Sequence, residues 1–293
     1  MNIEANDDVI RIIKNSYFKF SKGQKAIAQF IIDHYDKAAF MTAAKIGHTV
    51  DVSESTVVRF ATALGFDGYP ELQKALQVMI KNKLTTVQRI SLDEDQDDSD
   101  EFIKKVLKNE VASLKNYMEE LDQVRLEKAA DLIFNAKKIY ILGMRVSYTL
   151  ALYLGFYLDV ILDNVKVLNF GSNSLFEQVV RISEDDLFII ISYPRYSKQS
   201  LDAVNFVKDR NAKILAITDT ESSPFYAMSD IALLGKSNMV SFIDSLVTPM
   251  AVINSLIMSV GIREKDDIVQ YFDILENVWD KYSIYKKPVE EDS

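Results

Sequence analysis

The spacing of apolar residues changes once along the chain and divides it into two regions. In residues 1–84, apolar positions recur every three or four residues, which is the spacing of helices that bury one face. Beyond residue 100, short β-branched runs alternate with helix-length segments, as in a parallel sheet covered by helices on both faces. The pattern predicts an all-helical domain at 1–84 and an α/β domain at 101–285.

Two of the five helices predicted for the first region face each other across a tight turn. They are expected at 42–50 and 53–64, and the small residue Gly47 would let them approach closely. Ser53 can cap the second helix, because its hydroxyl can accept a hydrogen bond from a first-turn amide. Gly65 would end this helix in a left-handed conformation. The other three helices are expected at 6–20, 22–34 and 70–82.

By spacing alone, this pair of helices fits two structures. One is an ordinary helical hairpin in a core, and the other is a helix-turn-helix whose second helix enters the major groove of DNA. An apolar stripe on the second helix points inward and leaves its polar residues on other faces. For a DNA-binding motif, the expected contacts are Ser53, Ser55, Thr56 and Arg59, at the start and outer side of that helix.

The segment VSESTVVRFATALGFDGYPELQKAL resembles the DNA-binding domain of the RpiR (MurR/RpiR) family of bacterial transcriptional regulators. The matching positions are Val52, Ser53, Thr56, Val57, Arg59, Phe60, Leu64, Gly65, Phe66, Gly68 and Tyr69. Asp51 departs from the family pattern, in which glycine is usual, but aspartate tolerates the left-handed conformation better than most residues. The resemblance implies a DNA-binding domain with operator DNA as its partner.

Charge also separates the two regions. Residues 1–84 hold 11 basic and 9 acidic side chains, whereas the whole chain has a net charge of -9. This mildly basic front favours a DNA affinity that depends on dimerisation and base contacts more than on bulk charge. Residues 85–100 are expected to form a solvated linker, because 91–100 contain six acidic residues and little that could enter a core. Residues 286–293 are expected to be a disordered tail.

The second region predicts a parallel five-stranded sheet flanked by helices. Apolar runs suited to strands occur at 138–142, 165–168, 187–192, 214–218 and 231–234. Helix-length segments occur at 147–162, 172–182 and 197–210 among these runs, at 100–121 and 126–135 before them, and at 240–260 and 266–282 after them. Asp244, Ser245, Pro249 and Asn254 interrupt the apolar segment 240–260, which favours a buried interface helix over a membrane span.

Composition excludes several classes of protein. Cysteine is absent, which rules out disulfides and cysteine-ligated metals. The charged first residues lack the core of a signal peptide, and no apolar run reaches the roughly 18 to 20 residues of a membrane helix. A cytoplasmic protein without a membrane partner, metal or cofactor is therefore expected.

Three predicted loops at the carboxyl ends of the strands, where open α/β sheets bind ligands, are rich in hydrogen-bond donors. They span 143–147, 192–197 and 218–224. Hydroxyls and amides at helix N-termini suit an anion, and arginines in two of the loops add positive charge. Any one of these serines is more often only a helix cap, but three such loops at one edge favour a ligand site. The expected ligand residues are Gly143, Arg145, Ser147, Ser192, Arg195, Tyr196 and Ser197.

This region resembles the SIS (sugar isomerase) domain, a flavodoxin-like, phosphosugar-binding fold that RpiR-family regulators carry after their helix-turn-helix. Gly143 and Ser147 match its Gly-x-Gly-x-Ser motif, and residues 192–197 match its Ser-x-Ser-Gly-x-Thr loop. Arg145 replaces the second glycine of the first motif, and Pro194 and Arg195 replace the serine and glycine of the second. The resemblance implies a sugar phosphate as ligand, and the departures put that usual identity in question.

Three functions fit these features: a ligand-controlled transcription factor, an SIS-type sugar-phosphate isomerase with an accessory helical domain, and a protein-interaction scaffold. An isomerase needs a general base, commonly His or Glu. His34 and His48 both lie in the front region, and Asp219 and Glu221 are the only carboxylates of the three edge loops. We therefore expect a regulator that is not an enzyme.

A single helix-turn-helix reads few bases, so two copies are expected to bind a site with matching two-fold symmetry. The sequence predicts a homodimer or tetramer formed through the sheet domain. The helices expected at 100–121 and 240–260 should contribute to its interface.

Overall fold

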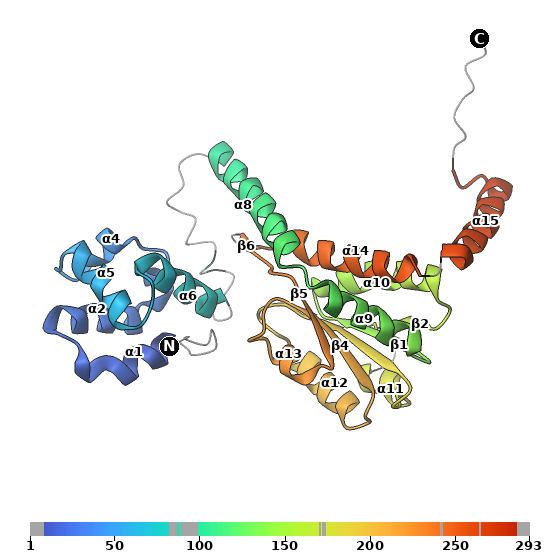
Figure 1. Ribbon diagram of the computed structural model, residues 1–293, viewed down its shortest axis with the longest axis horizontal. Helices are drawn as coiled ribbons and strands as arrows, with labels where there is room; N and C mark the ends of the chain where they lie inside the picture. The colour runs from blue at the N-terminus through green and yellow to red at the C-terminus, as the bar shows by residue number, and fades with distance from the viewer. Residues whose placement is uncertain are drawn as a thin grey trace, which may run out of the picture. The chain divides into compact units, whose positions relative to one another are not determined.

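The computed structural model describes residues 9–81, 87, 89, 99–169, 171, 174–240, 243–263 and 265–285 (Figure 1). The chain divides into two compact units. The first comprises Met1–Asn109, Pro194–Tyr196 and Asn238–Ser245, and the second comprises Glu110–Tyr193, Ser197–Ser237 and Leu246–Ser293. Each unit has its own buried apolar core.

The N-terminal part of the first unit, residues 9–81, is helical, as the spacing of apolar residues predicts. Its helices are α1 (Val9–Ser16), α2 (Lys22–Asp33), α3 (Tyr35–Ala38), α4 (Ala43–Thr49), α5 (Glu54–Ala63) and α6 (Tyr69–Lys81), with a 3₁₀ turn at Tyr17–Lys19. The predicted helix at 6–20 is therefore broken, and its first residues lie outside the described part of the chain. The short α3 was not predicted, because four residues are too few to show a helical period.

Side-chain caps fix where two of these helices begin. Ser21 and Gln24 form a capping box at the start of α2, in which each side chain bonds the backbone amide of the other residue. The Thr42 hydroxyl accepts a hydrogen bond from the Lys45 amide, 3.2 Å away, at the start of α4. These bonds satisfy first-turn amides that have no partner within their own helix.

Only Val87 and Arg89 are described between residues 82 and 98, so most of the predicted linker lies outside the described residues. Arg89 is not solvated as a linker residue would be, because it is only 2% exposed. Its guanidinium lies 2.8 Å from the Asp244 carboxylate. Breaking this ion pair would leave the buried charge of Arg89 without its carboxylate.

The second unit contains the predicted five-stranded parallel sheet, with strand order β2-β1-β3-β4-β5. The strands are β1 (Ile139–Gly143), β2 (Val165–Val167), β3 (Leu187–Ile191), β4 (Lys213–Thr218) and β5 (Ile231–Leu234). Every residue of β1 and β3 is buried, which explains why these runs are continuously apolar. In the register of these two strands, Gly143 lies opposite Ile191, so their following loops leave the same edge.

Helices cover both faces of this sheet (Figure 1). On one face lie α9 (Gln123–Asn135), α10 (Ser147–Ile161) and α14 (Val247–Gly261), which share a core cluster with residues of β1, β3, β4 and β5. On the other face lie α11 (Leu175–Val179), α12 (Lys198–Lys208) and α13 (Pro224–Met228). The long helix α8 (Ser99–Glu120) precedes α9, and α15 (Lys265–Tyr282) follows α14.

Two predicted helices are shorter than expected. The segment 240–260 is not one helix, because β6 (Met239–Val240) and β7 (Ile243–Asp244) pair as an antiparallel hairpin and α14 begins only at Val247. The helix expected at 172–182 shrinks to α11, whose start is set by a capping box between Ser174 and Glu177. No helix in the described part of the chain is long and apolar enough to cross a membrane.

Candidate functional site

The helix-turn-helix geometry rests on three backbone positions. A Cβ atom on Gly47 would lie 2.7 Å from the Val52 carbonyl oxygen, so only glycine allows α4 and the following turn to approach this closely. Asp51, in that turn, has φ 55°, and Gly65, just beyond α5, has φ 96°. The left-handed conformations predicted at both positions are confirmed: Asp51 shapes the turn that leads into α5, and Gly65 ends that helix.

The four predicted DNA-contacting residues lie together on the outer side of α5. Val57 and Phe60 are fully buried, whereas Ser53, Ser55 and Arg59 are exposed. The Ser53 hydroxyl lies 3.0 Å from the Ser55 hydroxyl and 2.8 Å from the Thr56 hydroxyl. Arg59 donates from Nε to the Ser55 carbonyl at 3.2 Å.

The prediction that the Ser53 hydroxyl caps α5 was wrong, because this hydroxyl makes no hydrogen bond to an amide of that helix. It bonds the neighbouring hydroxyls instead. The first turn of α5 therefore presents a cluster of hydroxyls and amides whose donors can turn toward phosphates or base edges. Contact of these residues with DNA stays a prediction.

The start of α2 adds a basic element that the sequence analysis missed. A Cβ on Gly23 would lie 3.3 Å from Val52 and 3.6 Å from Thr56, so the first turn of α2 packs beside the start of α5. Lys22 and Lys25 flank this glycine and are exposed. Their charges can reach phosphates on either side of the groove in which α5 would lie. The signal in the sequence was the pattern Lys-Gly-x-Lys directly after a capping serine.

At the carboxyl end of β1, the chain turns sharply into α10. A Cβ on Gly143 would lie 2.2 Å from the Ser147 carbonyl oxygen, so this position requires glycine. Arg145 is exposed and adopts φ 55°, the left-handed region that its replacement of a motif glycine implies. The amides of Ser147 and Tyr148 already bond the carbonyls of Met144 and Arg145, at 3.1 Å each. An anion at this helix would therefore rely on side chains more than on these two amides.

The loop after β3 begins with Ser192, whose backbone is held by β4. Its amide bonds the Ile217 carbonyl at 3.0 Å, and its carbonyl accepts from the Thr218 hydroxyl at 2.8 Å. Thr218 is fully buried and also lies 2.8 Å from the Ser223 hydroxyl. Thr218 thus ties the loop after β3 to the loop after β4. Sequence analysis placed Thr218 in an edge loop but not in this role.

Three predicted ligand residues carry hydroxyls that make no hydrogen bond to any other described residue: Ser147, Ser192 and Ser197. Ser147 and Ser192 are buried, at 5% and 6% exposure, and they follow neighbouring strands. Ser197 is the N-cap residue of α12 but does not bond an amide of that helix. Unused hydroxyls at the ends of β1 and β3 can hold the oxygens of a ligand.

The remaining residues of the second loop, Pro194–Tyr196, pack with the first unit. Arg195 is exposed and has φ 67°, so a second motif glycine is replaced by an arginine in the left-handed conformation. The predicted ligand contacts of Arg195 and Tyr196 stay predictions.

Tyr193 is a further polar group at this edge that sequence analysis did not single out. Its hydroxyl is buried and has no hydrogen-bond partner within the described ranges. Burial, and then the charges of Asp219 and Tyr117, raise the pKa of this hydroxyl well above its ordinary value. The group is therefore a neutral hydroxyl, able to donate one hydrogen bond, at the boundary between the sheet and its edge loops.

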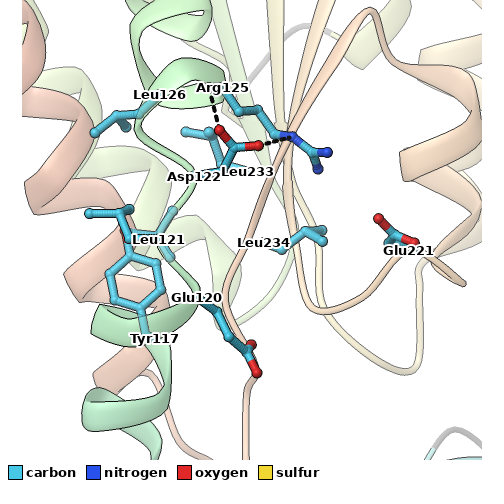
Figure 2. Close-up of a pocket in the computed structure, with 10 residues that line it drawn as sticks. Tyr117, Glu120, Leu121, Asp122, Arg125, Leu126, Glu221, Leu233 and Leu234 are labelled. Carbon is cyan, nitrogen blue, oxygen red and sulfur yellow. Dashed lines mark hydrogen bonds and ion pairs between the residues drawn. The ribbon is translucent and has the colours of Figure 1, made fainter.

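A cavity of about 220 Å³ lies at the other end of this edge, beside β5 (Figure 2). Leu121, Leu233 and Leu234 form apolar walls, and Arg125 and Glu221 lie at its sides. Most of its charged groups have partners: Asp122 caps α9 and lies 3.4 Å from Arg125, and Glu221 accepts from Tyr226 at 3.1 Å. Glu221, the carboxylate that left an enzymatic role possible in the sequence analysis, therefore lines the cavity beside β5.

Comparisons with known proteins match both halves of the chain. Residues 8–83 match the family described as a helix-turn-helix domain of the rpiR family, and residues 132–259 match the SIS domain. A helix-turn-helix-type transcriptional regulator of Clostridium perfringens, itself uncharacterised, is 26% identical over 77% of this chain and 80% of its own length. The regulator HexR of Pseudomonas aeruginosa is 23% identical over 98% of this chain and 99% of its own.

Two solved structures share this fold. The sugar isomerase domain of an RpiR transcription factor from Sphaerobacter thermophilus is 24% identical, with a TM-score of 0.56 over 59% of this chain and 97% of its own. The NanR protein of Vibrio vulnificus, solved in complex with ManNAc-6P, is 18% identical, with a TM-score of 0.55 over 92% of this chain and 99% of its own.

Proposed function

The chain belongs to the rpiR family of helix-turn-helix regulators that carry an SIS domain, and from this premise we propose that a small anionic ligand controls its binding to operator DNA. A sugar phosphate is the ligand we propose. The observation that carries the proposal is the pairing of two features in one chain: an outward polar face on α5, and hydroxyls at the ends of β1 and β3 that bond no other described residue.

For DNA, we propose that α5 enters the major groove with its first turn toward the bases. Ser53, Ser55 and Thr56 would contact phosphates or base edges, and Arg59, one turn further along, would bind a guanine or a phosphate. The chains would bind as a homodimer or tetramer that places two copies on one operator, because one recognition helix reads few base pairs. Binding to operator DNA also implies a cytoplasmic location.

For the ligand, we propose a site at the carboxyl ends of β1 and β3. Ser147, Ser192 and Ser197 would donate hydroxyl hydrogen bonds to its oxygens, and Gly143 lets the backbone turn sharply enough to bring Ser147 to the site. Arg145 supplies positive charge from the first loop. The contacts of Arg195 and Tyr196 are proposed from their place between Ser192 and Ser197 in the sequence.

We propose that the site binds its ligand without turning it over. The relatives named above are transcriptional regulators, and Glu221 borders the cavity beside β5. The alternative is an SIS-type sugar-phosphate isomerase with an accessory helical domain. Incubation of the purified chain with hexose and pentose phosphates, followed by detection of aldose–ketose interconversion, distinguishes the two: any turnover abolished by Glu221→Gln supports the isomerase.

The central experiment is a linked titration. An operator is first selected from random-sequence DNA, and ligands are screened by thermal shift, beginning with ManNAc-6P, other hexose phosphates and phosphorylated sugar acids. Calorimetry then measures ligand affinity with and without operator, on the wild type and on Ser147→Ala combined with Ser197→Ala. We expect the double variant to lose affinity, and the operator to change wild-type affinity about 5- to 150-fold. Equal affinity in both proteins would move the pocket elsewhere, and no effect of the operator would remove its regulatory role.

A further inference from the structure

The last described helix, α15, leads away from the body of the second unit (Figure 1). Its first turn is anchored, because a Cβ on Gly261 would lie 3.5 Å from Ile268 and 3.8 Å from Ile161. Beyond this point most residues of α15 are exposed. An isolated helix of 18 residues is only marginally stable in water, so the outer part of α15 needs a partner.

An apolar stripe runs along α15. It contains Ile268, Phe272, Leu275, Trp279 and Tyr282, which recur every three or four residues and therefore share one side of the helix. Phe272 is 37% exposed and Tyr282 is 65% exposed. The rings of Phe272 and Trp279, tilted against each other with centroids 6.4 Å apart, continue this surface.

Acidic residues occupy the other side of α15. Asp273 and Asp280 are exposed and fall away from the stripe in the helical repeat, whereas Glu276 lies one turn from Phe272, at the edge of the stripe. The helix is therefore amphipathic, and the side that needs covering carries no charge.

A matching surface lies on α10 and α14 of the same unit. Leu152 and Phe156 on α10 are 46% and 66% exposed, and Met258 on α14 is 61% exposed, with Ile262 just beyond that helix at 71%. The two helices pack side by side, and a hydrogen bond of 3.0 Å joins Tyr153 of α10 to Asn254 of α14. Asp159 is the only charged residue in either helix.

We infer that the apolar stripe of α15 packs on the α10–α14 surface of a second copy of this chain. Large exposed apolar surfaces of this kind mark interaction sites. The surface lacks charge and so suits the stripe, while the acidic side of α15 stays in water. Each chain has one stripe and one surface. In a two-fold symmetric dimer, each stripe packs on the surface of the other chain, so both are covered and no further copy is needed. The inference rests on the proposed function in one respect, the association of two chains, and it adds which helices form the contact.

The absence of cysteine allows a direct test of this contact. Phe156→Cys and Phe272→Cys variants of the full chain, one enlarged by a fused tag, are co-expressed and oxidised. We expect a disulfide-linked product of tagged and untagged chains. The same experiment with Asp273→Cys in place of Phe272→Cys should give little product, because Asp273 lies on the acidic side. Crosslinking of Phe272→Cys with itself as the main product would show that α15 pairs with α15 and would overturn the inference.

The single tryptophan provides a second readout, because Trp279 lies in the stripe. Dilution of the wild-type chain should shift its emission to longer wavelength as the dimer dissociates, in step with sedimentation. Phe272→Glu should raise the dissociation constant at least about 30-fold, as loss of a central aromatic contact does, and Asp273→Asn, on the acidic side, should leave it unchanged. A wild type that stays monomeric at micromolar concentration would refute both the homodimer and this contact. A dimer unaffected by Phe272→Glu would refute this contact alone.

Discussion

The hydrogen bonds of Thr218 make the clearest quantitative prediction about the ligand site. Thr218 is fully buried, and its hydroxyl lies 2.8 Å from both the Ser192 carbonyl and the Ser223 hydroxyl. A hydroxyl carries one proton, so the consistent arrangement donates to the carbonyl and accepts from Ser223. Thr218→Val keeps the volume and removes both bonds.

The expected cost follows from these two bonds. Each contributes about 0.5–1.5 kcal/mol net, and a buried acceptor left without a donor costs about 1–3 kcal/mol. Thr218→Val should therefore lower the free energy of unfolding by about 2 kcal/mol. Thr218→Ser, which keeps the hydroxyl and loses one buried methyl, should cost about 1 kcal/mol. Urea denaturation of the full chain, followed by circular dichroism, measures the free energy of unfolding of both variants.

The same substitution should separate stability from binding. Because Thr218 holds the backbone of Ser192, Thr218→Val should weaken binding of the ligand found by thermal shift, whereas Thr218→Ser should leave its affinity within about twofold, a difference of ~0.4 kcal/mol. Calorimetry at a temperature where both variants are fully folded makes the comparison. If valine and serine variants match each other in stability and in affinity, the hydroxyl does not position Ser192 and the reasoning fails.

Three further predictions concern other parts of the chain. Arg59→Ala should weaken operator binding by about 1–3 kcal/mol in fluorescence anisotropy, and an unchanged affinity in a folded variant would remove Arg59 from the interface. Arg145→Gly should raise the free energy of unfolding by up to about 1 kcal/mol, because the left-handed strain of ~1–2 kcal/mol at this position exceeds the entropic cost of glycine. The same variant should bind the ligand more weakly. A lower stability than the wild type would show that Arg145 is not strained. Burial opposes but does not outweigh the hydrogen bonds from Lys213 and the Ile214 amide, which hold the pKa of Asp230 below its ordinary value. The ionised Asp230 carboxylate therefore stabilises the fold above the pKa that this group has in the unfolded chain, and this stabilisation is lost as pH falls through its pKa in the folded chain. Asp230→Asn should lower the free energy of unfolding at pH 7 and change it little at pH 2, as measured by urea denaturation.

The sequence alone determined the features that depend on local spacing. Fully buried parallel strands must be continuously apolar, which located β1 and β3, and shorter apolar runs located β2, β4 and β5. The left-handed positions at Asp51 and Gly65 were predictable for a similar reason, because backbone sterics limit which residues tolerate them. The same holds for the glycine at the end of β1, whose motif implies a sharp turn.

Tertiary structure decided what depends on residues far apart in the chain. The bond from Thr218 to Ser192 joins two strands, and the ion pair of Arg89 with Asp244 joins residues 155 positions apart. The β6–β7 hairpin replaced an apolar segment that reads as helix, because two-residue strands are too short to show a period. Periodicity reports which side of an element is apolar, but not what covers it. Only the folded chain shows that the apolar side of α15 is covered at its first turn, while Phe272 and Tyr282 further along stay exposed among the described residues.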